Sequence, residues 1–346
     1  MTTNSSSASE LKIDVLMGTS LDDLEGQCRA RMATGVDGLF TFEGQHDPFL
    51  PLAIAANTVD ADLMTNVAIA FPRSPMQLAN VAYDLQVLSR GRFRLGLGSQ
   101  VKPAIEKRFG AEWTRPVPRM REWVQATKAI FAAWEGTAKL DFRGEFTTHT
   151  LMTPNFNPGP NPYGPPPVLV GALGPRMTEI AAEVADGVLV MPFNSARHLA
   201  ERTLPAIARG RAKGGRADGD VDVICEAIVC TGRTEEEVAV ATRGVKGLLS
   251  FYGSTPSYKP VLDVEGWGDL QPELNRLSKQ GEWATMSTLI DDDVLRTIGV
   301  FGTPEECGRE IVERFGAIAS RVSCYFPGYD IPPADLAALV ETVHAA

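Results

Sequence analysis

Short apolar runs alternate with amphipathic segments along the first hundred residues. The apolar runs are hydrophobic at nearly every position, which is typical of parallel strands covered by helices. The longest intervening segment carries apolar residues at helical spacing, among them Leu78, Ala82, Leu85 and Leu88. We expect strands at residues 11–17, 38–43, 63–70 and 92–97, and helices at 21–34, 49–59 and from Ser74 onward. This βαβαβαβ order predicts a parallel sheet.

The alternation continues in the second half of the chain. Strands are expected at 168–173, 187–191, 221–229 and 321–326, and helices at 118–134, 175–185, 196–213, 333–345 and from Thr234 and Thr303. Thr234 is followed three residues later by Glu237, which is a capping-box pattern. Eight strands alternating with helices predict an α/β fold, a TIM barrel. A doubly wound open sheet is the alternative, but no G-x-G-x-x-G motif follows the first strand.

Two stretches interrupt the alternation and are interpreted as insertions in a single domain spanning residues 11–346. The first, residues 137–167, contains an expected hairpin with Arg143-Gly144 at its turn, then a segment rich in Pro, Gly and Asn. The second, residues 248–293, is helical and carries Trp267 and Trp283. We expect both insertions to cover the active site and to set the substrate. Residues 1–10 are rich in Ser and Thr and are expected to form a disordered tail.

The composition narrows the possible partners. The 346 residues carry a net charge of −10 and a pI of about 5.1, which argues against a nucleic-acid or anionic-membrane surface. No run of about 18 apolar residues is present, so no membrane span is expected. The five cysteines lack C-x-x-C spacing, which indicates reduced thiols in a reducing, cytoplasmic compartment. No His or Cys motif predicts a metal site.

Candidate chemistry lies where the strands end, because TIM-barrel active sites are built at the C-terminal ends of the strands. Glu43 and His46 follow the second strand, and Asn66 and Val67 lie in the third. A histidine beside Asp47 can donate or accept a proton near neutral pH. A surface histidine in a polar loop is the equal alternative for His46.

Two glycine-containing strand ends indicate where a ligand would lie. Residues 92–100 read RFRLGLGSQ, and the paired glycines would let a flat ligand approach the backbone, while Ser99 after Gly98 adds a hydroxyl. The fifth strand runs into the next helix through Gly171, Ala172, Leu173, Gly174, Pro175 and Arg176. Backbone N–H groups at a helix start bind phosphate, and an arginine adds a charged fork. An ordinary βα turn is the alternative for this segment.

Two long runs resemble the signature segments of the bacterial-luciferase-like flavin and deazaflavin oxidoreductases. They are SPMQLANVAYDLQVLSRGRFRLGLGSQ, from Ser74 to Gln100, and GPRMTEIAAEVADGVLVMPF, from Gly174 to Phe193. The resemblance covers residues 11–330 and implies a TIM barrel with insertions. The stretches GQHDPF, GLGSQ and TPNFNPGP make the chain most similar to the branch that uses the deazaflavin coenzyme F-420 (F420).

The resemblance also implies roles for individual residues. His46 would face the central ring of the cofactor and assist proton or hydride chemistry. Asn66 and Val67 match a pair that often carries a non-prolyl cis peptide bond and presses a bulge against the ring. Gly98 and Ser99 match the strand-four contacts, and residues 172–175 match the segment that holds the phosphate side.

One departure from the family pattern concerns the proton donor. Some deazaflavin-dependent relatives place an acidic residue just after the strand-four glycines. This chain continues Gln100-Val101-Lys102 there, so that acid is absent. Glu43 and Glu106 are the candidate replacements.

The resemblance implies an oxidoreductase that transfers a hydride between C5 of F420 and an unidentified small organic substrate. One alternative is an FMN-dependent monooxygenase whose flavin is reduced by a partner reductase. The other is a cofactor-free binding barrel. A homodimer or higher homo-oligomer is also expected by resemblance.

Overall fold

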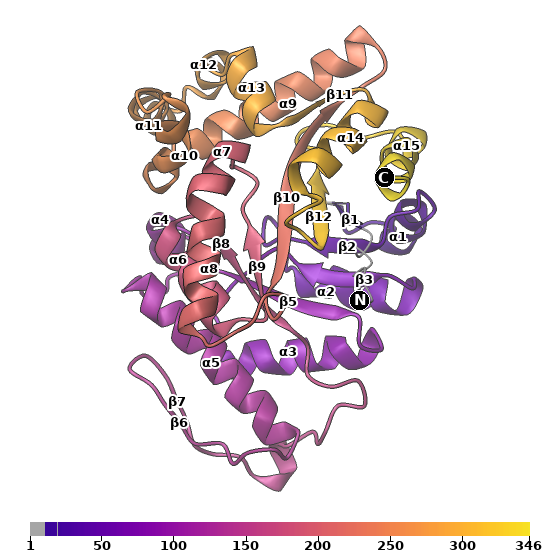
Figure 1. Cartoon of the computed structure of the whole chain (residues 1–346). Helices are drawn as coiled ribbons and strands as arrows, with labels where there is room; N and C mark the ends of the chain where they lie inside the picture. The colour runs from indigo at the N-terminus through magenta and orange to yellow at the C-terminus, as the bar shows by residue number, and fades with distance from the viewer. Residues whose placement is uncertain (1–10, 19) are drawn as a thin grey trace, which may run out of the picture.

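The computed structural model describes residues 11–18 and 20–346, so the predicted tail lies outside the described part. Eight parallel strands close into a barrel, as the pattern predicts (Figure 1). The last strand pairs with both the seventh and the first, which closes the ring. The strands are β1 (Lys12–Leu16), β2 (Gly38–Thr41), β3 (Asp62–Thr65) continued by β4 (Ala68–Ile69), β5 (Phe93–Gly98), β8 (Val168–Ala172), β9 (Gly187–Val190), β10 (Asp222–Thr231) and β12 (Arg321–Tyr325).

Helices cover the outside of the barrel. They are α1 (Leu24–Met32), α2 (Phe49–Thr58), α3 (Pro75–Leu88), α5 (Pro116–Trp134), α6 (Pro175–Val184), α8 (Leu204–Lys213), α14 (Pro304–Phe315) and α15 (Pro333–His344). The start of α3 is fixed by a capping box, in which the Ser74 hydroxyl accepts from the Gln77 N–H and the Gln77 side chain accepts from the Ser74 N–H. The helix expected at 196–213 is divided into α7 (Ala196–His198), a π-helical turn (Leu199–Thr203) and α8.

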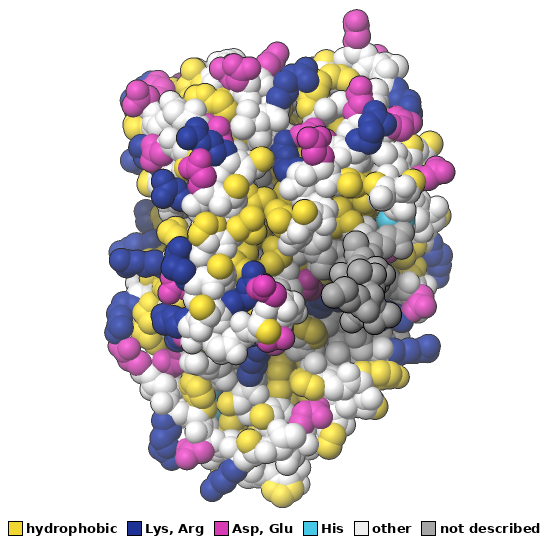
Figure 2. Space-filling view, viewed as in Figure 1, with side chains coloured by type: hydrophobic (Ala, Val, Ile, Leu, Met, Phe, Trp, Pro, Cys, Tyr) yellow, Lys and Arg dark blue, Asp and Glu magenta, His cyan; other side chains and the backbone are white. Residues whose placement is uncertain are grey.

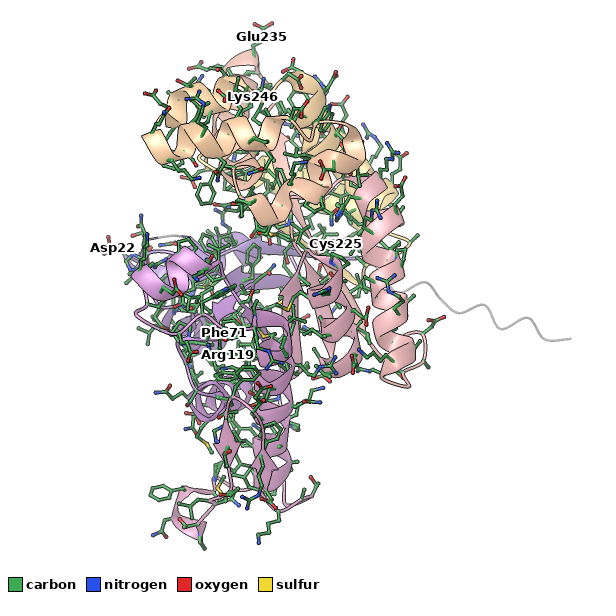
Figure 3. The ribbon with its side chains drawn as sticks, turned by 90° about the vertical axis from the view of Figure 1, so that its left-hand side faces the viewer. Asp22, Phe71, Arg119, Cys225, Glu235 and Lys246 are labelled. Carbon is green, nitrogen blue, oxygen red and sulfur yellow. The ribbon has the colours of Figure 1, made fainter. Side chains whose placement is uncertain are left out.

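A helical excursion stands over the C-terminal ends of the strands. It consists of α9 (Glu235–Gly253), a 3-10 turn (Pro256–Tyr258), α10 (Lys259–Glu265), α11 (Leu270–Gln280), α12 (Trp283–Thr288) and α13 (Asp292–Ile298). We call residues 235–298 the helical cap. Figures 1 and 3 show it above the barrel, with Glu235 at its outer tip and Cys225 in the barrel beneath it. The cap returns through β11 (Val300–Gly302), a strand not expected from the sequence, which pairs with the end of β10.

The helix expected from Thr234 belongs to this cap. Its apolar residues, such as Val245 and Leu249, pack in a hydrophobic cluster made mainly of cap residues. Cys307 and Ile311 of α14 instead pack in the barrel core. The barrel helix that follows β10 is therefore α14, and the excursion begins earlier than the expected residue 248.

The other excursion, residues 137–167, lies at the opposite end of the barrel. It connects the end of α5 to the start of β8 and contains β6 (Phe142–Arg143), β7 (Thr148–His149) and a 3-10 turn (Pro154–Phe156) (Figure 1). Its hairpin turn falls two residues later than expected, at Glu145-Phe146, because Arg143 pairs with Thr148 and the Gly144 N–H donates to Thr147 O. The prediction that this segment covers the active site is wrong, because a connection from a helix to the next strand lies at the N-terminal end of the strands.

One further helix and the contacts that anchor residues 137–167 were not expected from the sequence. Helix α4 (Lys102–Lys107) follows β5 and was not predicted from the sequence. The 137–167 segment is anchored to the barrel helices through the Tyr83 hydroxyl of α3, which donates to the Glu135 carboxylate (2.5 Å) and lies 2.9 Å from Gly159 O. Glu122 of α5 accepts the N–H groups of Phe146 and Thr147 at 2.7 and 2.6 Å.

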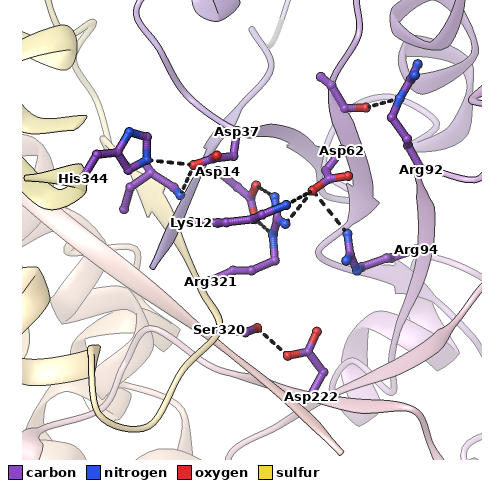
Figure 4. Close-up of polar contacts among 12 residues, drawn as sticks. Lys12, Asp14, Asp37, Asp62, Arg92, Arg94, Asp222, Ser320, Arg321 and His344 are labelled. Carbon is purple, nitrogen blue, oxygen red and sulfur yellow. Dashed lines mark hydrogen bonds and ion pairs between the residues drawn. The ribbon is translucent and has the colours of Figure 1, made fainter. Parts of the chain in front are cut away.

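The barrel interior is layered. Its middle is apolar and is filled by Phe40, Met64, Leu169, Leu189 and Ile224. Beneath them lies a charged layer in which the buried guanidinium of Arg321 binds both oxygens of Asp14 and donates to Asp62 at 2.6 Å (Figure 4). This network ties the closing strand β12 to β1 and β3. It lies at the end of the barrel opposite the cap.

The surface charges, the cysteines and the helices bear on the expectations drawn from the composition. Basic and acidic side chains are interspersed over the upper part of the face shown in Figure 2. All five cysteines are buried and unpaired. Among the described helices, none has both the length and the apolar character that a membrane crossing requires.

Candidate active site

A cavity of about 870 Å³ opens at the C-terminal ends of the strands, beneath the helical cap. This volume is in the range of pockets that hold drug-sized ligands and cofactors. The predicted residues that line it are Glu43, Asn66, Val67, Gly98, Ser99, Gly171, Ala172, Leu173 and Gly174. The strand order thus brings together predicted residues from the ends of four barrel strands, as the barrel prediction requires.

The floor of the cavity is built around Val67. Strand three is interrupted at Asn66–Val67 by a cis peptide bond, which confirms the bond type implied by the family resemblance. The break is held by Thr65, whose hydroxyl donates to Gly96 O at 2.8 Å and accepts from the Gly96 N–H at 2.9 Å. The strand then resumes as β4 against β5.

The glycines of β5 serve a purpose different from the one we expected. A Cβ on Gly98 would lie less than 3.0 Å from Val67 Cγ2, and a Cβ on Gly171 would lie 3.0 Å from Val67 Cγ1. Gly96 faces the Thr65 carbonyl in the same way. The space left by these glycines is therefore filled by Val67 and by strand three, so a ligand would rest on Val67 rather than on bare glycine backbone.

Glu43 supports this floor from β2. Its Oε2 accepts the Ile69 N–H at 2.7 Å and forms an ion pair with Arg73 Nη1 at 2.6 Å. The Glu43 N–H donates to Val67 O at 3.1 Å. Glu43 lines the cavity, but one carboxylate oxygen is already committed to holding β4 in place.

One wall of the cavity is the start of α6. Residues 171–174 line it, and Gly174 is the N-cap residue, with no side chain capping the first turn. A Cβ added to Gly174 would meet no atom within 4 Å, so the backbone there is openly accessible. Pro175 and Arg176 are exposed and lie outside the cavity lining.

His46 does not reach the cavity in this structure. It is exposed on the loop between β2 and α2 and is absent from the lining residues. Lys102 lines the rim of the cavity, but its side chain is exposed and its Nζ lies 3.6 Å from Glu106 Oε1. His46 as a catalytic residue therefore stays a prediction.

The sequence reasoning missed an acid on the cavity floor, Glu226 of β10. Glu226 lines the cavity, and no side chain among the described residues forms an ion pair or hydrogen bond with its carboxyl group. Burial raises the pKa of Glu226 to about 8. The available signal was a single charged residue inside the otherwise apolar strand VICEAIVC.

The roof and remaining wall are aromatic. Phe251, Tyr252 and Tyr258 line the cavity from the cap, and Tyr325 lines it from β12. Burial raises the pKa of Tyr258 to about 12, and burial together with Glu226 raises the pKa values of Tyr252 and Tyr325. These phenols are therefore neutral hydrogen-bonding groups at physiological pH.

No cluster of His, Cys, Asp and Glu suited to a metal ion occurs in residues 11–18 and 20–346. None of the five cysteines lines the cavity. What the cavity does offer is a closely packed apolar floor, a helix start without a side-chain cap, and a carboxyl group whose pKa is raised by burial. Such a site suits a flat cofactor with an anionic side and a small substrate stacked beside it.

The comparisons with known proteins define the class. The model of the luciferase-like monooxygenase family matches residues 3–321, and the chain belongs to this family. An uncharacterised protein of Mycobacterium tuberculosis, Rv1360, is 46% identical over 316 residues, which cover 91% of this chain and 93% of Rv1360.

Two further relatives are reductases. The 5,10-methylenetetrahydromethanopterin reductase of Archaeoglobus fulgidus is 27% identical over 276 residues, covering 77% of this chain and 76% of the reductase. The solved structure of the coenzyme F420-dependent tetrahydromethanopterin reductase of Methanopyrus kandleri superposes with a TM-score of 0.75 at 19% identity, covering 96% of both chains. The likeness to this structure establishes the shared barrel fold. Family membership makes the chain an oxidoreductase with a flavin-type or deazaflavin-type site as the natural candidate.

Proposed function

We propose that the chain is an F420-dependent oxidoreductase that transfers a hydride between C5 of the deazaflavin and a small organic substrate. The observation that carries this proposal is the Val67 floor, wedged between Gly98 and Gly171 beneath a cavity of about 870 Å³. A flat tricyclic ring fits against such a floor, with room left above it for a substrate. The similarity to methylenetetrahydromethanopterin reductases supports F420 over FMN.

The described residues fit the cofactor at both of its ends. Asn66, Val67, Gly98 and Ser99 would lie against the ring system. The open backbone of residues 171–174 and the uncapped start of α6 would accept the phosphate side. When bound, the deazaflavin supplies the hydride chemistry, and the protein supplies orientation and electrostatics.

The proposed roles of the acids and of His46 differ. Glu43 acts as a positioning residue, because it holds Ile69 and Arg73 and thereby the floor. His46 assists from the loop after β2. We also propose a cytoplasmic location, from the cysteine pattern, and a homodimer or higher homo-oligomer, from the resemblance; cell fractionation and light scattering would test them.

Titration of the purified protein with F420 and, separately, with FMN tests the cofactor, followed by absorbance, fluorescence and thermal stabilisation. We expect binding of F420. Gly174→Phe should weaken that binding at least about tenfold without lowering the melting temperature, because the ring enters open space at the cavity wall.

Gly247→Phe is the matched control, since Gly247 also has open space around its Cβ position but does not line the cavity. Tight FMN binding without F420 binding would favour the monooxygenase that the family name describes. No stabilisation by either cofactor would favour a cofactor-free barrel and refute the proposal.

A further inference from the structure

Glu226 is an isolated acid at the floor of an apolar cavity. Ile224, two residues earlier on β10, packs in the barrel interior, whereas Cys225 packs in the core between barrel and helices. Because side chains alternate along a strand, Glu226 points into the barrel above Ile224. In the register of β9 and β10, Ile224 lies opposite Leu189, which itself lines the cavity. Glu226 therefore stands at the point where the packed interior ends and the cavity begins.

The groups around Glu226 come from two elements, α9 and β12. Tyr252 projects from α9 and Tyr325 from β12, whereas Cys324, next to Tyr325 on β12, packs in the core between barrel and helices. The charge of Glu226 acts on all three groups. Ser323, its register partner on β12, has a fully buried hydroxyl without a partner among the described residues. No lysine, arginine or histidine of the described residues pairs with Glu226.

An unpaired carboxyl group in such surroundings keeps its proton. Burial disfavours the carboxylate, and no cation offsets that cost, so the group is mainly the neutral acid at pH 7. A neutral carboxylic acid has one O–H donor to offer, and the protein leaves that donor unused. The natural acceptor is an oxygen of whatever occupies the cavity.

The rest of the cavity restricts the molecule that brings this oxygen. The wall opposite the floor is aromatic, from Phe251, Tyr252 and Tyr258. Apart from Glu226, the Asp, Glu, Lys and Arg side chains in its lining are Lys102 at the exposed rim and Glu43, which is paired with Arg73. An anionic substrate would find no cationic side chain in the lining apart from Lys102 at the rim, so its charge would lose water without gaining a partner.

We propose that Glu226 donates a proton to the oxygen of a neutral, largely apolar ketone or aldehyde that the protein reduces. This inference rests on the proposed function. The hydride from reduced F420 forms the new C–H bond at the carbonyl carbon, and the π electron pair of the carbonyl moves to its oxygen. That oxygen takes the proton of Glu226, which yields an alcohol, oxidised F420 and the Glu226 carboxylate. Solvent then returns a proton to Glu226, and the alcohol is oxidised when the same steps run backwards.

The first test needs no cofactor. Infrared difference spectra between the wild-type protein and Glu226→Gln isolate the carbonyl stretch of one protonated carboxylic acid and follow it with pH. We expect this band to be present at pH 7 and to disappear with a midpoint near pH 8. A band that is already absent at pH 7 would overturn the proposal. Glu235→Gln, at the exposed tip of the cap (Figure 3), is the matched control and should leave the band unchanged.

The second test uses protein loaded with reduced F420 and cyclohexanone as the probe, with 4-oxocyclohexanecarboxylate as its anionic counterpart. Glu226→Gln should lower kcat about 100-fold or more with little change in KM, as expected for loss of a general acid. Glu226→Asp should recover part of the activity. The wild-type rate should fall above about pH 8, where Glu226 loses its proton. The nearby phenols of Tyr252, Tyr258 and Tyr325 titrate at higher pH, so they do not account for this fall.

The outcomes separate the two proposals. Wild-type protein that binds no F420 refutes the proposed function, and with it the reduction, whatever the infrared titration shows. Protein that binds F420 and reduces cyclohexanone equally well with Gln at position 226 refutes the proton donor alone. Preference for the anionic ketone, or reduction of neither ketone, refutes the substrate class.

Discussion

The contact between Gly98 and Val67 gives the sharpest test of the cavity floor. Gly98→Ala places a methyl group less than 3.0 Å from Val67 Cγ2, whereas non-bonded carbons prefer about 3.5–4.0 Å. Val67 would have to retreat by at least about 0.5 Å to restore that separation. It has little room to do so, because its other methyl group lies close to Gly171 on the neighbouring strand.

The cost of the substitution follows from this overpacking. Forcing an extra methyl group into a packed site costs about 1–3 kcal/mol. The entropy of unfolding scales with chain length, and 346 residues correspond to about 0.7 kcal/mol per kelvin. Gly98→Ala should therefore lower the melting temperature by about 1.5–4 °C.

Circular dichroism melting curves of Gly98→Ala, Val67→Ala, the double variant and Gly247→Ala check this reasoning. Val67→Ala/Gly98→Ala should be less destabilised than the sum of its two single variants, because the colliding methyl groups are gone. Gly247→Ala, inside α9 with open space around its Cβ, should stabilise the protein by about 0.5–1 kcal/mol. If Gly98→Ala melts at or above the wild-type temperature, or if the double variant is simply additive, Val67 does not occupy the space over Gly98.

Three further predictions concern the barrel base and the loop after β2. Arg321→Met should destabilise the protein by about 3–5 kcal/mol in urea unfolding, because it leaves the buried Asp14 carboxylate unpaired, whereas Arg276→Met in an exposed pair should cost less than about 1 kcal/mol. Burial alone would raise the pKa of Asp62, but the Arg321 guanidinium lowers it below its ordinary value. The stability that Asp62 contributes is therefore present at neutral pH and is lost as the pH falls below about 4. A pH series of melting temperatures without such a decline would contradict this. His46→Ala should lower turnover about 100-fold with an unchanged melting temperature, and unchanged turnover would remove His46 from the mechanism.

The barrel could be predicted because its physical cause is local. Parallel strands buried on both faces must be apolar throughout, and each is followed by a helix whose apolar stripe has a different period. These patterns located all eight barrel strands. What they could not locate was the break in strand three, because the Asn66–Val67 interruption depends on contacts with Thr65, Gly96 and Glu43 from three strands.

The two insertions show where element order carries more information than composition. Residues 137–167 look like a lid by their Pro and Gly content, yet they follow a helix and precede a strand. Such a connection lies at the N-terminal end of a barrel, away from the site. The cap could not be recognised from element order, because α9 follows a strand as a barrel helix would but does not run back along the barrel. No local pattern distinguishes its capping box at Thr234 from the one at Thr303, which begins a true barrel helix.

Glu226 was overlooked for a related reason. The sequence interpretation placed candidate chemistry near the C-terminal ends of the strands and in the loops that follow them, because loops carry function. Glu226 lies within β10, at an inward position, and only the closed barrel shows that this position faces a cavity and not the packed interior. A single acid at a strand position whose side chain points into the barrel is nevertheless a usable sequence signal, because a buried charge without a partner is costly to keep.

The division of the cavity between barrel and cap bears on what determines its specificity. Val67, Gly98 and Gly171 hold one another in place within the barrel, so a change at any of them disturbs the floor. The aromatic wall comes from the cap, whose hydrophobic cluster is largely separate from the barrel core. We therefore expect substitutions at Phe251 or Tyr258 to reshape the cap side of the cavity without moving the floor. Under the proposed function, such variants should change the substrate preference and leave F420 affinity unchanged.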